Sequence, residues 1–307
     1  MSATLQASIA RAVERRTNHL DQYKELLAIP SVSTTVARKG DVQRCGEWVA
    51  DQLRAAKLDR VEVLPTPGHP IVYGEWLGAP GKPTVLVYGH YDVQPAVVAD
   101  GWDTDPFTPT VKGDYVYARG ASDMKGQIFA QIKALESITA GGPPQVNIKY
   151  LIEGEEEIGS ENLEDFIDTH KDLLKCDVVL NCDACIEGKD QPGITYSLRG
   201  LAYFEIKLQG PGRDLHSGRF GGSVRNPIHV LADLIAGMHD EKGRVTLPGF
   251  YDKVRDLEPD ERAGLKKLPY SDAHWLEMTG SKGLYGEEGF TTLERVGARP
   301  TLEVNGI

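Results

Sequence analysis

The sequence predicts an α/β fold in which helices flank a mostly parallel sheet. A short continuous apolar run within residues 84–88, at 85–88, is typical of a strand buried on both faces, and further strands are expected at residues 146–152 and 178–181. Segments with apolar residues at helical spacing alternate with these expected strands, at residues 41–57, 125–138 and 162–174. Strands that alternate with helices in this way usually form a parallel sheet with helices on both faces.

Local patterns predict the remaining elements of the first part of the chain. An amphipathic helix is expected over about residues 4–28, because apolar residues recur at helical spacing until Pro30 ends the pattern. Strand-like runs follow at residues 61–64 and 71–76. Residues 89–123 are rich in Gly, Asp and Pro. They predict a long ordered loop, and such a loop in a compact domain is usually functional.

The pattern changes after about residue 196. Residues 202–208 alternate between apolar and polar positions and predict a half-buried strand, and residues 227–238 predict a helix that begins with a proline. Residues 244–300 are rich in charge, Gly and Pro, with few strand signals. We therefore expect a boundary near residue 197, with domains at residues 1–197 and 198–307.

The charge of the chain is concentrated in one window. The 307 residues include 45 acidic and 34 basic residues, a formal net charge of −11, and residues 151–190 alone hold thirteen acidic residues against three lysines. This distribution argues against a nucleic-acid-binding protein, whose binding face would be basic. The window has two possible explanations, which are a solvated acidic helix and a carboxylate-rich metal site.

Composition also bears on the compartment. No apolar run approaches the roughly 18–20 residues that a membrane-spanning helix needs, and the N-terminus lacks the apolar core of a secretory signal. Four cysteines in a chain of this length do not form a disulfide scaffold. We therefore expect a cytoplasmic protein that binds neither a membrane nor nucleic acid.

Acidic residues and a histidine lie at the carboxyl ends of predicted strands or in the loops that follow them, at the edge where open α/β sheets bind ligands. The four segments are Gly89-His90-Tyr91-Asp92, the turn at 119–126 with Asp123, the run at 153–160 with Glu155, Glu156 and Glu157, and Asp183. Each has an ordinary explanation when taken alone, as a surface pair, a helix N-cap, a solvated helix start or a turn. Their occurrence together predicts a single site.

The residue types indicate which chemistry this site could perform. One histidine and three or more carboxylates suit two divalent cations that share a bridging carboxylate and a bridging water. A ligating imidazole commonly donates its other N–H to a carboxylate, a role open to Asp92. The metals would lower the pKa of the water, and a carboxylate that is not a ligand would act as general base. Nitrogen and oxygen donors without thiolates suit Zn²⁺ or Mn²⁺ better than copper.

Five motifs resemble those of the M20 metallopeptidase family, and in particular its cytosolic non-specific dipeptidase and carnosinase-like branch. They are GHYDVQP, DGWDTDPF, RGASDMKG, EGEEEIGS and DLHSGRFGG, in the family's order. The resemblance implies a phosphorylase/hydrolase-like catalytic domain with an inserted α+β lid that forms a homodimer. It also implies hydrolysis of dipeptides or short peptides by two divalent ions, with Zn²⁺ expected and Mn²⁺ or Co²⁺ as alternatives.

The resemblance assigns roles to individual residues. The residues that match metal ligands are His90, Asp123, Glu157 and Asp183, with Asp123 as the bridge. Asp92 matches the carboxylate that orients His90. Glu156 matches the catalytic base, because alignment on Ile158-Gly159-Ser160 puts the base and its neighbouring ligand at 156 and 157 rather than one residue earlier. His216 matches a lid histidine that, in family dimers, reaches the partner's active site and binds the substrate carbonyl or its oxyanion.

The sequence departs from the family in one respect. A second, late histidine ligand has no counterpart, and the chain stops at Ile307 in a segment that resembles the inside of the lid. We therefore expect a fragment that lacks the C-terminal return of the catalytic domain and is inactive by itself. Two alternatives stay open, which are hydrolysis of another amide, such as an N-acyl amino acid or a succinylated substrate, and a catalytically silent binding module.

Overall fold

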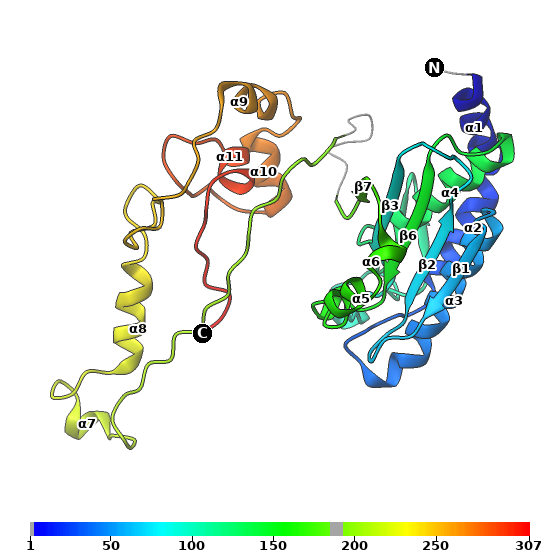
Figure 1. Cartoon of the computed structure of the whole chain (residues 1–307). Coiled ribbons are helices and arrows are strands. Elements are labelled where there is room, and N and C mark those ends of the chain that lie inside the picture. The colour runs from blue at the N-terminus through cyan, green and yellow to red at the C-terminus, as the bar shows by residue number, and fades with distance from the viewer. Residues whose placement is uncertain (1–2, 185–192) are drawn as a thin grey trace. The chain divides into compact units, whose positions relative to one another are not determined.

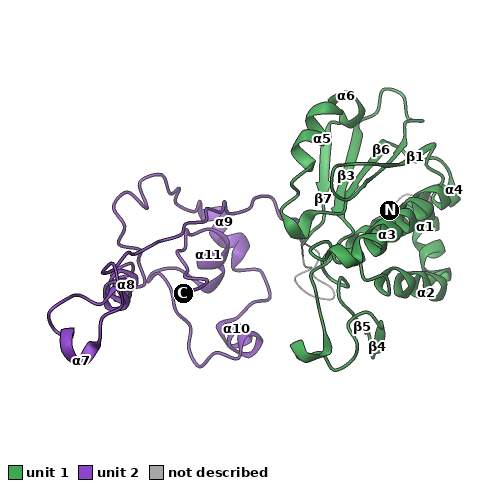
Figure 2. Ribbon diagram, turned by 90° about the horizontal axis from the view of Figure 1, so that it is seen from below, with its two compact units in different colours: residues 1–185 green, residues 186–307 purple. Residues whose placement is uncertain are grey.

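The computed structural model describes residues 3–184 and 193–307 (Figure 1). Two compact units make up the chain, Met1–Cys185 and Ile186–Ile307 (Figure 2). The assignment of residues 1–197 to a catalytic domain and of 198–307 to a lid stays a prediction. No helix in the described part of the chain is both long enough and apolar enough to cross a membrane.

A five-stranded sheet in the order β1-β2-β6-β3-β7 forms the centre of unit 1. Its strands are β1 (Arg60–Leu64), β2 (Ile71–Trp76), β3 (Thr84–His90), β6 (Asn147–Glu153) and β7 (Val178–Asn181). β1–β2 and β2–β6 pair antiparallel, whereas β6–β3 and β3–β7 pair parallel. The α/β fold class is confirmed, and the sheet is mixed. The parallel strands β6, β3 and β7 are the ones whose carboxyl ends lie near the predicted site residues.

Helices cover both faces of this sheet (Figure 2). They are α2 (Arg16–Leu27), α3 (Lys39–Ala55) and α4 (Lys125–Gly141) on one side, with α1 (Ala3–Glu14) packed against α4, and α5 (Leu163–Thr169) and α6 (Lys171–Leu174) on the other. Val72 and Ile152 belong to the core under α2, α3 and α4, whereas their neighbours Tyr73 and Leu151 belong to the core under α5 and α6. This division follows from the alternation of side chains along a strand.

Two predicted helices are interrupted in the structure. The helix expected at 4–28 forms α1 and α2 with a break at Arg15, whose backbone angles (φ −91°, ψ 7°) leave the helical region. The helix expected at 162–174 forms α5 and α6, separated by His170 (φ −121°). The predicted long loop contains the hairpin β4 (Thr110–Lys112) and β5 (Tyr115–Tyr117).

Unit 2 consists of short helices within its described residues 193–307. They are α7 (Ser217–Phe220), α8 (Pro227–Ala236), α9 (Pro259–Leu265), α10 (Asp272–Thr279) and α11 (Thr292–Gly297). The strand expected at 202–208 is wrong, because no described segment pairs with these residues, and Tyr203 and Phe204 are 79% and 89% exposed. An alternating pattern forms a strand only where a neighbouring strand satisfies its backbone.

Candidate metal centre

Three parallel strands end side by side, and the predicted site residues follow those ends. His90 is the last residue of β3 and pairs with Glu153, the last residue of β6. Asp183 lies two residues beyond β7. Because β3 pairs in parallel with both β6 and β7, the carboxyl ends of the three strands meet at one edge of the sheet. This edge is where open α/β sheets bind ligands.

Close packing of α4 on β3 brings Asp123 to the same edge. A Cβ at Gly89 would lie 2.5 Å from Ile128 Cγ2 and 2.9 Å from Met124 Cε, so the strand and the helix approach more closely than any other residue would allow. Asp123 comes directly before Met124, the residue that precedes α4. The glycine therefore sets the separation between Asp123 and the end of β3.

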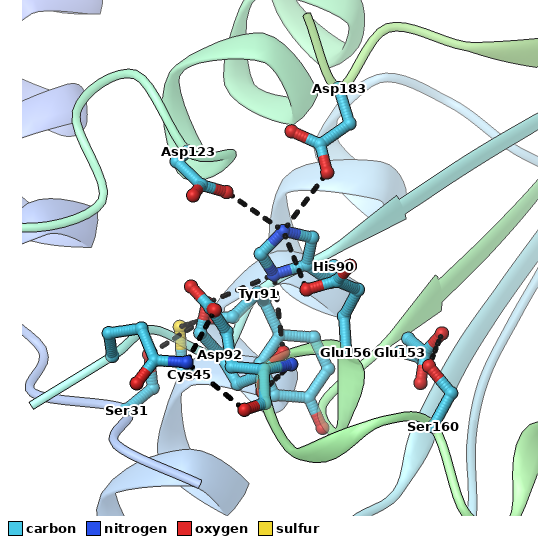
Figure 3. Close-up of polar contacts among 12 residues, drawn as sticks. Ser31, Cys45, His90, Tyr91, Asp92, Asp123, Glu153, Glu156, Ser160 and Asp183 are labelled. Atoms are coloured by element: carbon cyan, nitrogen blue, oxygen red, sulfur yellow. Dashed lines mark hydrogen bonds and ion pairs between the residues drawn. The ribbon is translucent and has the colours of Figure 1, made fainter. Parts of the chain in front are cut away.

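The carboxylates of Asp123, Asp183 and Glu156 converge on one nitrogen of the His90 ring (Figure 3). His90 Nε2 lies 3.2 Å from Asp123 Oδ1, 3.5 Å from Asp183 Oδ2 and 3.9 Å from Glu156 Oε2. Potential ligand atoms of His90, Asp123 and Glu157 all lie within 4.8 Å of one another. The His90 side chain is 0% exposed and that of Asp123 is 59% exposed, so the cluster opens to solvent on the Asp123 side.

Asp92 contacts His90 on the other side of the ring. His90 Nδ1 lies 3.2 Å from Asp92 Oδ1 and 3.1 Å from the Asp92 backbone oxygen. Asp92 Oδ2 accepts a hydrogen bond of 3.1 Å from the backbone N–H of Glu157. Asp92 therefore contacts the imidazole through both its backbone oxygen and its carboxylate, and the same carboxylate binds the acidic loop.

An N-terminal segment holds the chain around Asp92 in place. Ser31 Oγ donates to the Tyr91 carbonyl at 2.7 Å, and the Val93 N–H donates to the Ser31 carbonyl at 3.0 Å. The fully buried Lys125 donates through Nζ to the Leu26 and Ile29 carbonyls, at 3.2 and 2.6 Å. These contacts connect the end of α2, the start of α4 and the segment that follows β3.

Burial and mutual repulsion both disfavour the charged forms of the acidic groups in the cluster. Burial raises the pKa of Glu156, Glu157 and Asp183, and neighbouring carboxylates raise it further. Burial alone would lower the pKa of His90, but the hydrogen bond with Asp92 and the charges of Asp92, Glu156 and Asp183 outweigh burial and raise it to about 9.

The donor set fits a divalent cation. Within the described residues, no Lys or Arg forms an ion pair with Asp123, Glu156, Glu157 or Asp183, so a single histidine faces four carboxylates. Partly buried carboxylates of this kind require a compensating positive charge. Imidazole nitrogen together with carboxylate oxygen suits Zn²⁺ and Mn²⁺.

A model of peptidase family M20/M25/M40 matches residues 86–298, which include the whole cluster. The chain belongs to the M20 peptidase family. Cys-Gly metallodipeptidase dug1 of Schizosaccharomyces pombe is 35% identical over 310 residues, which cover 96% of this chain and 64% of that protein. Beta-Ala-His dipeptidase of Rattus norvegicus is 31% identical over 310 residues, which cover 94% and 63%.

A solved structure of an M20 relative has the same fold. The di-peptidase Dug1p of Saccharomyces cerevisiae superposes with a TM-score of 0.75 and 29% identity, over 94% of this chain and 64% of that one. The chain thus spans less than two thirds of the length of these three relatives.

The three consecutive glutamates that follow β6 in this M20 chain differ in burial and in their partners. Glu155 is buried, and its carboxylate accepts hydrogen bonds from the His69 N–H at 2.9 Å and from Asn162 Nδ2 at 2.8 Å. Glu156 and Glu157 are half-buried and lie in the short 3₁₀ helix Glu156–Ile158. Glu155 therefore anchors the loop, and the next two residues are the ones available to a ligand.

The remaining predicted residue, His216, lies in unit 2. It precedes α7, is exposed, and accepts hydrogen bonds through its backbone oxygen from Arg219 and Phe220. Its relation to the His90 cluster stays a prediction.

Two residues that hold the segments around the cluster in place were not predicted from the sequence. Gln94 contacts Glu157, and Lys125 connects α4 with α2. Gln94 could have been found, because His90, Asp92 and Gln94 occur at every second position and alternate residues of an extended segment share one side. Lys125 gave no such signal, since its partners are 96 and 99 residues away.

Proposed function

We propose that this chain is part of a metal-dependent dipeptidase and that its His90 cluster binds two divalent ions. The ligands would be His90, Asp123, Glu157 and Asp183, with Asp123 as the bridge. Zn²⁺ is the proposed ion, and Mn²⁺ and Co²⁺ are the alternatives. The observation that carries the proposal is the convergence of a buried imidazole and several uncompensated carboxylates at the carboxyl edge of three parallel strands.

The chemistry would be hydrolysis of a peptide bond by water. Bound ions of this type polarise the scissile carbonyl and make a water molecule more acidic. Glu156 is the proposed general base, which takes a proton from the water and later gives it to the leaving amine. Two features support this role. Its side chain is 39% exposed and can reach water, and its raised pKa favours holding the proton between the two steps.

Other residues would position the reacting groups. Asp92, fully buried against Nδ1, would keep the His90 imidazole turned so that Nε2 faces the ions. His216 would stabilise the oxyanion from the partner subunit of a homodimer formed through the lid, as the family resemblance implies. The proposed setting is the cytoplasm.

Dipeptides are the proposed substrates because two relatives are named for them. One is a Cys-Gly metallodipeptidase and the other a Beta-Ala-His dipeptidase. The family's late histidine ligand has no counterpart in this chain. We therefore also propose that the 307-residue chain alone hydrolyses dipeptides poorly or not at all, because one ion would lack a ligand.

The test compares this chain with a chimera in which the C-terminal part of the S. pombe relative, beyond the matched region, follows Ile307. Both are assayed with Cys-Gly, β-Ala-His and N-acyl amino acids in the presence of Zn²⁺ or Mn²⁺. We expect the chimera to hydrolyse the dipeptides and the chain alone to be inactive. Glu156→Gln should reduce turnover about 10²–10⁴-fold, and the exposed Glu161→Gln in the same loop should not.

The possible outcomes separate the parts of the proposal. Turnover by the chain alone, removed by Glu156→Gln, would contradict only the expected inactivity. Hydrolysis of N-acyl amino acids without hydrolysis of dipeptides would replace the proposed substrate class. A chimera whose activity survives Glu156→Gln would refute the assignment of the base.

A further inference from the structure

Gln94 contacts the cluster but has no role in the function proposed above. It lies two residues after Asp92 and is half-buried. Its partner Glu157 is 63 residues away in the sequence, on the loop that follows β6. The contact therefore joins the segments that follow two neighbouring parallel strands, β3 and β6.

Gln94 holds Glu157 at two points. Gln94 Nε2 donates to Glu157 Oε2 at 2.8 Å and to the Glu157 backbone oxygen at 3.1 Å. Asp92 Oδ2 accepts from the Glu157 N–H at 3.1 Å. The backbone N–H, the backbone oxygen and one carboxylate oxygen of Glu157 are thus all bound by residues 92–94. No described residue donates a hydrogen bond to the other carboxylate oxygen, Oε1.

The chemistry of an amide suits this position. The amide group of Gln94 is a neutral donor, so it fixes the Glu157 carboxylate without cancelling its charge. A lysine or arginine here would form an ion pair with Glu157, and that ion pair would compete with a bound cation. The Glu157 side chain has several rotatable bonds, which contacts with its partners must restrain before it can act as a preformed ligand.

We propose that Gln94 is a positioning residue for cation binding, which occupies Glu157 Oε2 and presents Oε1 to a divalent ion. The inference rests on the proposed function, because it assumes that Glu157 is a metal ligand. Hydrogen-bond partners of metal ligands typically change metal affinity or activity by about 10–100-fold when they are removed. An effect of that size is expected at Gln94.

The experiment measures binding of Zn²⁺ and, separately, Mn²⁺ to the 307-residue chain by calorimetric titration. Gln94→Leu removes the amide and keeps a side chain of similar size. We expect it to weaken binding about 10–100-fold. Gln52→Met is the matched control, because Gln52 Oε1 accepts from Lys133 Nζ between α3 and α4 and has no contact with the cluster. It should bind both ions like the unchanged chain, and circular dichroism checks that each variant is folded.

A double-mutant cycle distinguishes positioning from a general effect on the loop. In a Glu157→Ala background, Gln94 has no carboxylate to hold, so Gln94→Leu should cause little further loss of affinity. Equal losses in both backgrounds, or unchanged binding by Gln94→Leu alone, would overturn the inference and leave the proposed metal site intact. If the unchanged chain binds neither ion, the proposed function fails and this inference fails with it.

Discussion

The protonation of His90 predicts how metal affinity depends on pH. The pKa of His90 is raised to about 9 in the chain without metal, because Asp92, Glu156 and Asp183 stabilise the imidazolium more than burial destabilises it. A metal ion binds the neutral imidazole, so binding at neutral pH must release this proton. Metal affinity should therefore increase as the pH rises toward 9.

The size of the effect follows from the difference between the pH and the pKa. At pH 7 a group with a pKa of about 9 is about 99% protonated, so the apparent affinity is about 100-fold weaker than above pH 9. Between pH 7 and 8.5 the apparent Kd should fall by slightly less than tenfold per pH unit. The raised pKa values of Glu156, Glu157 and Asp183 act in the same direction at lower pH, since these carboxylates must also lose protons before they bind an ion.

The assay is calorimetric titration of the chain with Mn²⁺ at pH 6.5, 7.5 and 8.5, in buffers with different ionisation enthalpies. The buffer dependence of the heat counts the protons released, and we expect about one for each chain that binds metal near pH 7.5, because His90 is the only histidine among the described residues of the cluster. His19→Gln is the control. It removes a histidine on α2 whose pKa is lowered, first by burial, and whose nearest acidic partner is Glu136.

A flat profile would refute this reasoning. If the affinity changes by less than about threefold from pH 6.5 to 8.5 and no proton is released, His90 either is neutral in the free chain or does not bind the ion. If His19→Gln removes the pH dependence, the released proton comes from His19 and not from His90.

Three further predictions concern folding. Without metal, the free energy of unfolding should decrease by about 3 kcal/mol as the pH rises from 6.5 to 9. The raised pKa of His90 stabilises the folded state fully below pH 6.5, and this stabilisation is lost as the pH approaches 9. Urea unfolding at both pH values measures the difference, and equal stability would contradict the prediction. Gly89→Ala should destabilise unit 1 by about 1–3 kcal/mol and weaken Mn²⁺ binding, since the new Cβ would clash with Ile128, whereas Gly264→Ala, with open space around its Cβ, should do neither. Lys125→Met should cost about 1–3 kcal/mol in urea unfolding because it removes two buried hydrogen bonds, and a cost below about 0.5 kcal/mol would show that these bonds are dispensable.

The elements of the sheet could be predicted because their signals are local. β2 has the predicted bounds, 71–76, and the strands expected at 84–88, 146–152 and 178–181 correspond to the adjacent strands β3, β6 and β7. Their positions in the sequence also placed His90, Glu156 and Asp183 at or just after predicted strands and Asp123 at the start of a helix, and the structure brings these residues together.

The residues of the acidic window divide into two groups in the structure. Glu156, Glu157 and Asp183 lie at the cluster, whereas Glu164 and Asp168 are exposed on α5. Composition alone could not divide the window, because burial depends on where each loop folds relative to β3.

Other features depend on contacts that no local pattern contains. The alternation at 202–208 resembles a strand, but a strand also needs a neighbour, and none lies among the described residues. Glu155 looks the same as Glu156 in the sequence, and only its contacts with His69 and Asn162 identify it as an anchor. The spacing of His90, Asp92 and Gln94 could place Gln94 near the site, but its partner Glu157 lies 63 residues away, and only the structure identifies that contact.

The most direct test of the account is a crystal structure of the chain with Zn²⁺, with anomalous data collected at the zinc edge. We expect an anomalous peak about 2.0–2.1 Å from His90 Nε2, with carboxylate oxygens of Asp123, Glu157 or Asp183 about 2.0–2.2 Å from it. A well-ordered cluster without a peak at saturating Zn²⁺, or zinc bound only at other residues, would contradict it.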